Sequence, residues 1–312
     1  MDKLKSLQTF RYKEDKEIEK SVEERKVSST VSRPSSSTSN RISKPSPKKK
    51  KVVKNPTESA SIKSKIEENY PIDVYKDVQP SLTENQILLF IGYNPGVESS
   101  LQQHHYAHFS NLFWKLFNQS KTFLRVLQRI DENYIEKNIE NDELLQSLVK
   151  DGITYLKPVH DYDIIKYKVG FTDLVLRCTR TAQELTLIEK LQNVPRLLSE
   201  FNRSNCKFLV FIGKGIWEII VKFMMNELGI KKFKLSKNTF VWGFQQELHE
   251  KTSLEEVRIY NLILKKLQLK VPNHSRIYVF PNTSGLVASL SYDEKLALWT
   301  DLAADIMPSP KT

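Results

Sequence analysis

A short polar turn follows the first apolar run of the sequence. The run Gln86–Gly92 is nearly all apolar and predicts a buried strand, and the turn that follows reads GYNPG over Gly92–Gly96. Ligands of open α/β sheets bind beyond the carboxyl ends of the strands, so this turn stands where a site would lie. Asn94 is placed to hold a water and to offer a carbonyl dipole to a developing cation. An Asn-Pro-Gly sequence alone is an ordinary tight turn, so the residues that follow must decide.

Those residues are a histidine and tyrosine cluster, followed by the helix start NLFWK. Tyr106 is flanked by His104, His105 and His108, and these polar neighbours favour stacking on a planar ligand over a place in the core. His105 is a candidate for the lining of the same site, although a lone surface histidine is the commoner case. Asn111 either bonds the edge of a ligand or caps the helix, and the sequence leaves both interpretations open.

The order and spacing of these motifs resemble the mismatch-specific uracil/thymine DNA glycosylases, a branch of the uracil-DNA glycosylase superfamily. That family has Gly-x-Asn-Pro-Gly after a strand, then an aromatic that stacks on a flipped base, then an Asn-x-Phe-Trp helix start. The resemblance runs from about residue 86 to 306 and fails in the amino-terminal arm and in residues 131–165. At Asp173 the family usually has Asn or Lys. Further matching stretches are GFTDLV at 170–175, FIGKGI at 211–216, Trp242-Gly243 and FPNTSGL at 280–286.

The resemblance implies a monofunctional glycosylase that hydrolyses the N-glycosidic bond of uracil in mismatched double-stranded DNA, and to some extent that of thymine or other damaged pyrimidines. This reaction initiates base excision repair and requires the nucleotide to leave the stack. Asn94 would position the attacking water, and the chemistry would be slow because an amide is a weaker base than a carboxylate. The resemblance assigns the base pocket to Gly92, Tyr93, Ser99, His105, Tyr106, Asn111 and Thr172.

A second loop in the resemblance would contact the DNA. Leu286 corresponds to a wedge that fills the gap left by the flipped base. Asn282, Ser284 and Gly285 belong to the same loop, whose hydroxyl and backbone N–H groups would hold phosphates. Bacterial relatives have an arginine that reads the opposite guanine where this chain has Ala288, so we expect a looser dependence on guanine.

Ser99 indicates the base preference. In the resemblance it lies where the pocket faces carbon 5 of the base. A hydroxyl is larger and more polar than the alanine of thymine-processing relatives, and it matches the serine of bacterial uracil-preferring ones. We therefore expect uracil to be cut faster than thymine, since one methyl group typically changes rates by ~10–200-fold.

No cofactor or metal is predicted. Gly213-Lys214-Gly215 lies between a strand and a helix, where Lys214 would contact a DNA phosphate, but simple close packing explains it equally well. The spacing is neither that of a P-loop nor that of GxGxxG. Only two cysteines occur, which is too few for a structural zinc and indicates a reducing, intracellular setting.

The regular elements predict an α/β fold with three layers, a mainly parallel sheet flanked by helices, as in uracil-DNA glycosylases. Residues 131–165 are predicted to be an insertion, a charged loop with one short helix. Pro195 is expected to kink or divide its helix. Predicted strands are Gln86–Gly92, Lys207–Gly213, Thr239–Phe244 and Ile277–Phe280; predicted helices are about Phe109–Arg129, one capped by Thr186 with Glu189, one after Gly215, and one capped by Ser291 with Glu294.

The excess positive charge lies mostly in the amino-terminal arm. The net charge is +11, and residues 1–70 hold 18 Lys and Arg against 10 Asp and Glu, while residues 71–312 hold 30 against 27. The arm is rich in Lys, Ser and Glu and is predicted to be disordered, with the glycosylase domain at 71–307 and a short tail at 308–312. The basic run Lys48, Lys49, Lys50 and Lys51 predicts a nuclear localisation signal and a non-specific DNA tether, or else a solvated charge run.

Two other classes of protein remain open. One is a glycosylase-like nucleic-acid-binding module with weak catalysis; the other is a Rossmann-type nucleotide-binding enzyme, for which the sequence offers no fingerprint. The expected partners are double-stranded DNA with mismatched or damaged bases and an abasic-site endonuclease downstream. A monomer is expected. No membrane contact is expected, because no apolar run approaches the roughly 18–20 residues that span a bilayer.

Overall fold

The computed structural model describes residues 75–249, 255–285 and 290–307. The predicted arm with its lysine run, the wedge residue Leu286 and Ala288 lie outside this part of the chain. None of the helices within it combines the length and the apolar character needed to span a membrane.

A five-stranded sheet forms the centre of the domain, in the order β4-β1-β5-β7-β6. The first four strands in this order are parallel, and only the two-residue β6 at the edge is antiparallel. Three of the parallel strands are buried along their whole length, as expected for strands covered on both faces. The strands are β1 (Leu88–Gly92), β4 (Val169–Asp173), β5 (Phe208–Ile212), β6 (Gly243–Phe244) and β7 (Arg276–Phe280).

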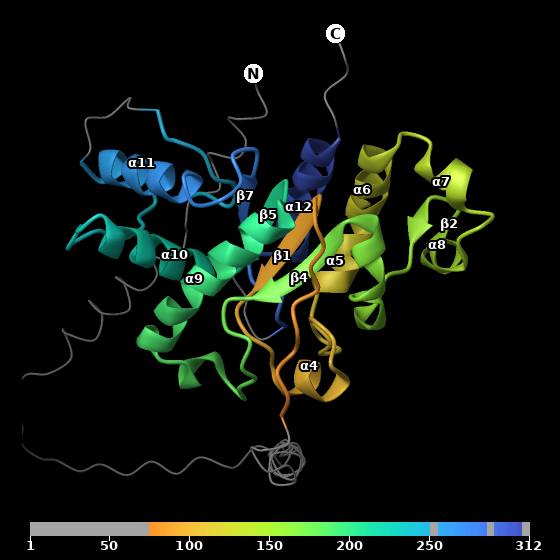
Figure 1. The fold of residues 1–312 in the computed structure, drawn as a ribbon, viewed down its shortest axis with the longest axis horizontal. Helices are drawn as coiled ribbons and strands as arrows, with labels where there is room; N and C mark the ends of the chain where they lie inside the picture. Colours follow the sequence, from red (N-terminus) through yellow and green to blue (C-terminus); the bar gives the residue numbers. More distant parts are fainter. Residues whose placement is uncertain (1–74, 250–254, 286–289, 308–312) are drawn as a thin grey trace, which may run out of the picture. The chain divides into compact units, whose positions relative to one another are not determined.

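Helices cover both faces of the sheet, which confirms the predicted three-layer α/β class. Figure 1 shows α9, α10 and α11 on one side of the sheet and α5, α6 and α12 on the other. The first group is α9 (Leu187–Ser204), α10 (Lys214–Glu227) and α11 (Glu255–Gln268); the second is α5 (Phe113–Gln119), α6 (Thr122–Ile130) and α12 (Tyr292–Ile306).

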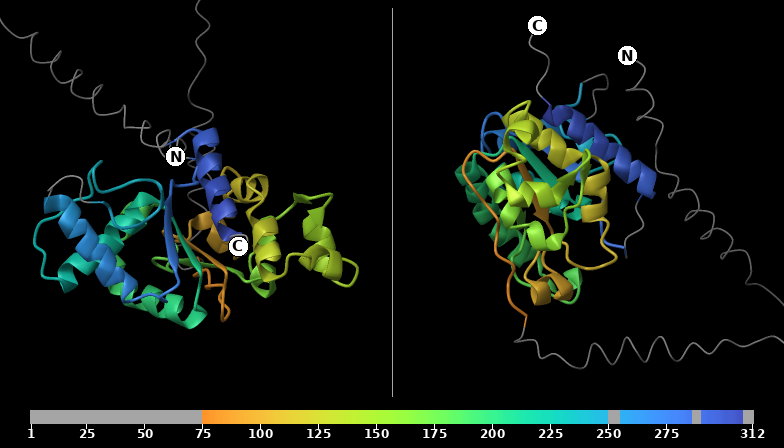
Figure 2. Two further views of the ribbon diagram at one scale, coloured as in Figure 1. Left: turned by 90° about the horizontal axis from the view of Figure 1, so that it is seen from above. Right: turned by 90° about the vertical axis from the view of Figure 1, so that its right-hand side faces the viewer.

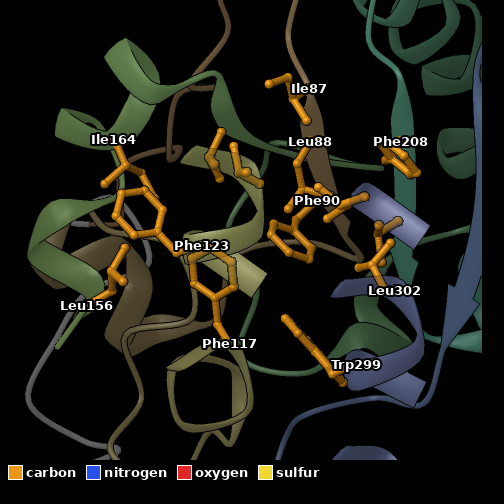
Figure 3. Packing of buried hydrophobic residues seen from close by; sticks show 14 of the residues in the cluster. Ile87, Leu88, Phe90, Phe117, Phe123, Leu156, Ile164, Phe208, Trp299 and Leu302 are labelled. Carbon is orange, nitrogen blue, oxygen red and sulfur yellow. The ribbon is translucent and has the colours of Figure 1, made fainter. Parts of the chain in front are cut away.

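Two apolar clusters, one on each face, fix these layers. Alternate residues of a strand point to opposite faces, so Phe90 joins one cluster and Ile91 the other. Phe90 stacks on Trp299 of α12 with ring centroids 5.3 Å apart, and Figure 3 shows both residues in the same buried group as Phe117 and Phe123. On the other face Phe211 packs against Trp217 of α10.

The predicted helix over residues 109–129 was wrong in two places. Phe109 lies outside it with its side chain 94% exposed. The remainder is two helices, because Lys121 adopts a left-handed backbone conformation with φ 59° between α5 and α6. The predicted strand at 239–244 shrinks to β6, since Thr239 belongs to a turn closed by its hydrogen bond to Ser236. Pro195, by contrast, lies inside a single helix, α9.

Residues 131–165 are more regular than the predicted loop with one short helix. They form α7 (Tyr134–Asn138), α8 (Glu143–Leu148) and a small hairpin of β2 (Val149–Lys150) with β3 (Ile153–Thr154). Figure 2 shows this segment at one end of the domain. Its buried side chains, among them Leu145 and Leu148, join the same apolar cluster as Phe90. Neither β4 nor α11 was predicted.

Candidate functional site

The turn after β1 and the loop after β4 lie side by side at the carboxyl ends of their strands. The two strands are parallel neighbours, and Gly92 stands opposite Asp173 at their carboxyl ends. The loop is then tied to the turn along its length, by N–H groups of Leu174, Val175 and Thr179 that donate to the carbonyls of Gly92, Tyr93 and Pro95. The backbone that carries Asn94 is therefore held by the neighbouring strand as well as by its own.

The Asn94 amide has a fixed orientation. Its Nδ2 donates to the carbonyl oxygens of Pro95 and Arg177, both at 3.2 Å, and to Thr179 Oγ1 at 2.7 Å. A carbonyl oxygen only accepts, so the nitrogen must face these partners and Oδ1 must point the other way. Asn94 thus presents an oriented acceptor, which suits holding a water and facing positive charge.

A buried carboxylate anchors the histidine pair after α4 (Val97–Gln102). Asp161 is fully buried and accepts 2.8 Å hydrogen bonds from the Nδ1 atoms of His104 and His105 and from the backbone N–H groups of His105 and Tyr162. A proton on Nδ1 of a neutral His105 ring leaves its Nε2 as an acceptor. His105 is only 3% exposed, so it is not a surface histidine.

Tyr106 has one ring face covered and a strained backbone. Its ring stacks on Phe113 with centroids 4.0 Å apart and planes within 1°, so only the opposite face can receive a flat ligand. Its φ of 54° lies in the left-handed region, which is uncommon for a bulky residue and is typical of functional sites. Asn111 Oδ1 accepts from the backbone N–H of Phe113, the first residue of α5, at 3.0 Å, while its predicted base contact stays a prediction.

The hydroxyl of Tyr106 and the carboxyl group of Asp173 lie beside Gly92, and His105 is close enough to Asp173 to interact with its charge. A Cβ at Gly92 would lie 2.0 Å from Asp173 Oδ1 and 3.1 Å from the Tyr106 hydroxyl, so only glycine leaves room for the carboxyl group. Among the described residues, neither the buried Tyr106 hydroxyl nor the buried His105 Nε2 has a hydrogen-bond partner. Burial raises the pKa of Asp173 to about 6, with His105 and Arg196 acting in the opposite direction. Burial, and then the charge of Asp173, raise the pKa of Tyr106.

Comparison with known proteins identifies the family of the chain. The profile of the uracil DNA glycosylase superfamily matches residues 80–303 of the chain. The chain belongs to the uracil DNA glycosylase superfamily. It is also 28% identical over 260 residues to a G/U mismatch-specific uracil DNA glycosylase of Schizosaccharomyces pombe. That alignment covers 82% of this chain and 62% of the relative. The resemblance predicted from the motifs is thereby confirmed at the level of the family.

Two acidic residues of the site, Asp173 and Asp161, were not predicted from the sequence. Asp173 was noted only as a departure from the family, and its place beside Gly92 depends on the pairing of β1 with β4. Asp161 lies in the segment 131–165, where nothing in the local sequence separates it from other surface carboxylates. Only the long-range contact with His104 and His105 reveals it.

Three predicted pocket residues take different positions. Ser99 is buried and its Oγ accepts from Ala107 N at 3.2 Å, close to the Tyr106 segment. Thr172 donates to Glu200 at 2.7 Å, on the face of β4 opposite to Asp173. The ring of Tyr93 lies 3.3 Å from the Cβ position of Gly215, on the α10 side. The structure therefore brings Ser99 toward the Tyr106 group, but not the Thr172 side chain or the Tyr93 ring.

The described part of the predicted DNA-contact loop packs against the residues before α5. Asn282 Oδ1 accepts from Ser284 N at 2.8 Å, and the Thr283 carbonyl accepts from Leu112 N at 2.8 Å. A Cβ on Gly285 would lie 2.8 Å from Ser110 Oγ. This contact places the loop next to the segment that carries Tyr106 and Asn111, while its DNA contacts stay predictions.

Within the described residues, neither Lys214 nor the potential metal ligands form a second binding site. Lys214 begins α10, with its Nζ 3.8 Å from Glu218 Oε1 and 5.0 Å from the centroid of the Phe240 ring, so its predicted phosphate contact stays a prediction. In residues 75–249, 255–285 and 290–307, no three His, Cys, Asp or Glu side chains are grouped to hold a metal. Cys178 and Cys206 are both buried and free.

Proposed function

We propose that this chain is a monofunctional DNA glycosylase that hydrolyses the N-glycosidic bond of uracil in double-stranded DNA. The observation that carries the proposal is the Asn94 amide, held by three hydrogen bonds so that Oδ1 faces away from the protein carbonyls. Membership of the superfamily supports it. The printed name of the Schizosaccharomyces pombe relative, a G/U mismatch-specific uracil DNA glycosylase, supports the choice of uracil in a mismatch.

The reaction begins when the target nucleotide leaves the base stack and its base enters the pocket. One face of the base stacks on the free face of Tyr106. As the bond between N1 and C1′ breaks, its electron pair leaves with the base and the sugar becomes oxocarbenium-like. A water held by Asn94 Oδ1 attacks C1′ and loses a proton to solvent, and the base anion takes up a proton after it departs. The oriented amide dipole stabilises the positive charge on the sugar.

Base preference is proposed to follow from Ser99, and tolerance of the opposite base from Ala288. A buried hydroxyl at Ser99 gives a thymine methyl little apolar contact, so uracil is cut faster than thymine. Without an arginine at position 288, opposite bases other than guanine are tolerated. Some thymine and other damaged pyrimidines are also processed in this proposal, which places the enzyme at the first step of base excision repair.

The surrounding interactions are proposed from sequence. Leu286 wedges into the gap in the duplex, and Asn282, Ser284 and Gly285 contact the phosphates beside it. Residues 1–70 act as a basic tether, with Lys48–Lys51 directing the protein to the nucleus. The protein acts as a monomer and leaves an abasic site for an endonuclease. Removing residues 1–70 is expected to weaken binding to all duplexes alike and to flatten the salt dependence.

The test is single-turnover excision from a U·G duplex, read as alkali-labile sites, by the full chain and by Asn94→Ala. Losing a positioned catalytic group typically costs ~10²-fold or more, while DNA binding should persist. The matched control is Asn226→Ala, an exposed asparagine of α10, which should keep the full rate. Excision by Asn94→Ala at the rate of the unmodified chain would show that Asn94 is not the catalytic residue. Duplex binding without excision by the unmodified chain would favour the weakly catalytic binding module.

A further inference from the structure

Among the large apolar side chains of the described residues, Phe109 is the most exposed, at 94%. It lies three residues after Tyr106, in the segment that leads to α5. A lone exposed apolar residue is common on protein surfaces, so exposure by itself indicates nothing. At Phe109 the fixed backbone and the neighbouring loop add two independent observations.

The turn that carries Phe109 is closed by hydrogen bonds on both sides of the residue. The His108 carbonyl accepts from Asn111 N at 2.8 Å. His108 Nδ1 accepts from Ser110 N at 3.2 Å and lies 2.9 Å from Ser110 Oγ, within hydrogen-bond distance. The His108 ring stacks against the Phe109 ring, with centroids 4.6 Å apart and planes 28° from parallel. The turn therefore supports one face of the Phe109 ring and leaves the other face open.

The same turn packs against the loop that is proposed to contact DNA. A Cβ on Gly285 would lie 2.8 Å from Ser110 Oγ and 2.9 Å from the Ser110 carbonyl oxygen. Two residues further on, Leu112 N donates to the Thr283 carbonyl at 2.8 Å. Phe109 thus projects from a turn that lies beside residues 283–285.

Tyr106 is close to Phe109 along the chain. Three Cα–Cα steps separate the two residues and span at most about 11 Å. Successive nucleotides of one strand are roughly 3.4 Å apart along the duplex axis. When a flipped base stacks on the Tyr106 ring, the nucleotides next to it are therefore within reach of the Phe109 ring.

We infer that Phe109 stacks on a base of the duplex next to the flipped nucleotide. This inference deepens the proposed function and rests on it. A base that leaves the stack uncovers a face of its neighbour, and an apolar side chain that covers this face offsets part of the unstacking cost. Every base has a flat aromatic face, so the contact tolerates any flanking sequence.

The neighbours of Phe109 favour a base over a protein as the partner of the ring. Protein interfaces bury an aromatic anchor within a cluster of well-packed side chains. Here the residues around the ring, His108, Ser110 and Asn111, are polar. A base needs only a flat aromatic surface, and the open face of Phe109 provides one.

The experiment compares binding of the full chain, Phe109→Ala and Phe109→Tyr to a U·G duplex whose target sugar carries a 2′-fluorine. The fluorine destabilises an oxocarbenium-like sugar, so the uracil stays attached. In two separate duplexes, 2-aminopurine replaces the base on one side or the other of the uracil. Its fluorescence is low when it is stacked and rises when it loses a stacking neighbour.

We expect Phe109→Ala to bind the duplex ~5–100-fold more weakly, as removal of an aromatic ring from a base typically does. At one of the two probe positions, fluorescence in the bound state should be higher with Phe109→Ala than with the full chain. Phe109→Tyr keeps the ring and should behave like the full chain. The unfolding temperature of Phe109→Ala should not change, because the side chain is exposed.

The matched control is Leu269→Ala, which removes another exposed apolar side chain. Leu269 is 83% exposed and follows α11, before the start of β7. It therefore lies toward the amino ends of the parallel strands, whereas Asn94 and Asp173 lie at the carboxyl ends. Leu269→Ala should bind the duplex as the full chain does.

The outcomes separate this inference from the proposed function. Equal affinity of Phe109→Ala and the full chain, or equal fluorescence at both probe positions, overturns the stacking of Phe109. A Phe109→Tyr variant as weak as Phe109→Ala overturns it too. All three results leave the glycosylase activity standing if the full chain releases uracil from an ordinary U·G duplex. Failure of the full chain to release uracil there overturns the proposed function itself.

Discussion

Asn94 and Asp173 lie just beyond and at the carboxyl ends of neighbouring strands, but their surroundings differ. The Asn94 amide nitrogen has three hydrogen-bond acceptors, so its orientation is set by the folded chain alone. Around Asp173 the Tyr106 hydroxyl and the His105 Nε2 have no partner within the described residues. The Asn94 side of the site, the complete half, has its hydrogen bonds without a ligand. The side formed by Asp173, Tyr106 and His105, the unpaired half, leaves two polar groups without a partner in the described residues.

This difference matches the two tasks that the proposed reaction sets. A water must be held in place before the base arrives, which a fully bonded amide achieves without reorganisation. The base must be recognised by atoms that are unpaired until it enters, because a site whose polar groups are left unpaired by the wrong ligand rejects it most strongly. The scaffold of the unpaired half is itself well bonded, through the four hydrogen bonds that Asp161 accepts.

The largest effect is expected where the two halves meet, at Gly92. In Gly92→Ala the new methyl group would lie 2.0 Å from Asp173 Oδ1, so the carboxyl group must move. We expect uracil excision to fall by ~10²-fold and stability by about 1–3 kcal/mol. Single-turnover rates and thermal unfolding measure both. The control Gly96→Ala places its methyl group in open space at a negative φ, so its unfolding temperature should not change. A normal rate for Gly92→Ala would show that the two halves are not adjacent.

A smaller effect is expected from loosening the complete half at Thr179. Thr179→Val keeps the shape but removes the Oγ1 that accepts from Asn94 Nδ2 at 2.7 Å. The amide then keeps two carbonyl partners and gains freedom, so the single-turnover rate should drop by ~10-fold with unchanged duplex affinity. Thr179→Ser retains the hydroxyl and should recover most of the rate. Equal loss in both variants would mean that packing, and not the hydrogen bond, holds Asn94.

The smallest effect concerns the wall of the unpaired half at Ser99. Ser99→Ala removes the hydroxyl that accepts from Ala107 N, at a cost of about 1 kcal/mol in stability. It also makes room for a methyl group on the base, so the ratio of thymine to uracil excision should rise by about 10-fold. Parallel rates on T·G and U·G duplexes give the ratio. An unchanged ratio would place Ser99 away from carbon 5 of the base.

Local signals in the sequence predicted the starts of α9 and α12 and three of the four parallel strands, β1, β5 and β7. Ser291 and Glu294 form the predicted capping box. Thr186 caps α9, but its predicted partner Glu189 bonds Arg177 with its carboxylate, which sequence spacing cannot show. The break at Lys121 was missed because a left-handed lysine has no sequence signal comparable to glycine.

The candidate site divides in the same way. Asn94, Tyr106 and their order along the chain are visible in the sequence because a local motif carries them. Asp161 is invisible there, since it acts across 56 positions on the backbone and ring of His105. The role of Asp173 depends on the register of β1 with β4, which is a property of the sheet and not of either strand alone.

The most direct test of the two-part site is a crystal structure of Asn94→Ala bound to a duplex that carries a U·G mismatch. We expect a flipped uracil stacked on the free face of Tyr106. Its polar edge should lie within about 3.2 Å of the Asp173 carboxyl group, and its C1′ should face the position of the missing Asn94 amide. A uracil that remains stacked in the duplex, or that enters the protein without touching Asp173 and Tyr106, would contradict this expectation.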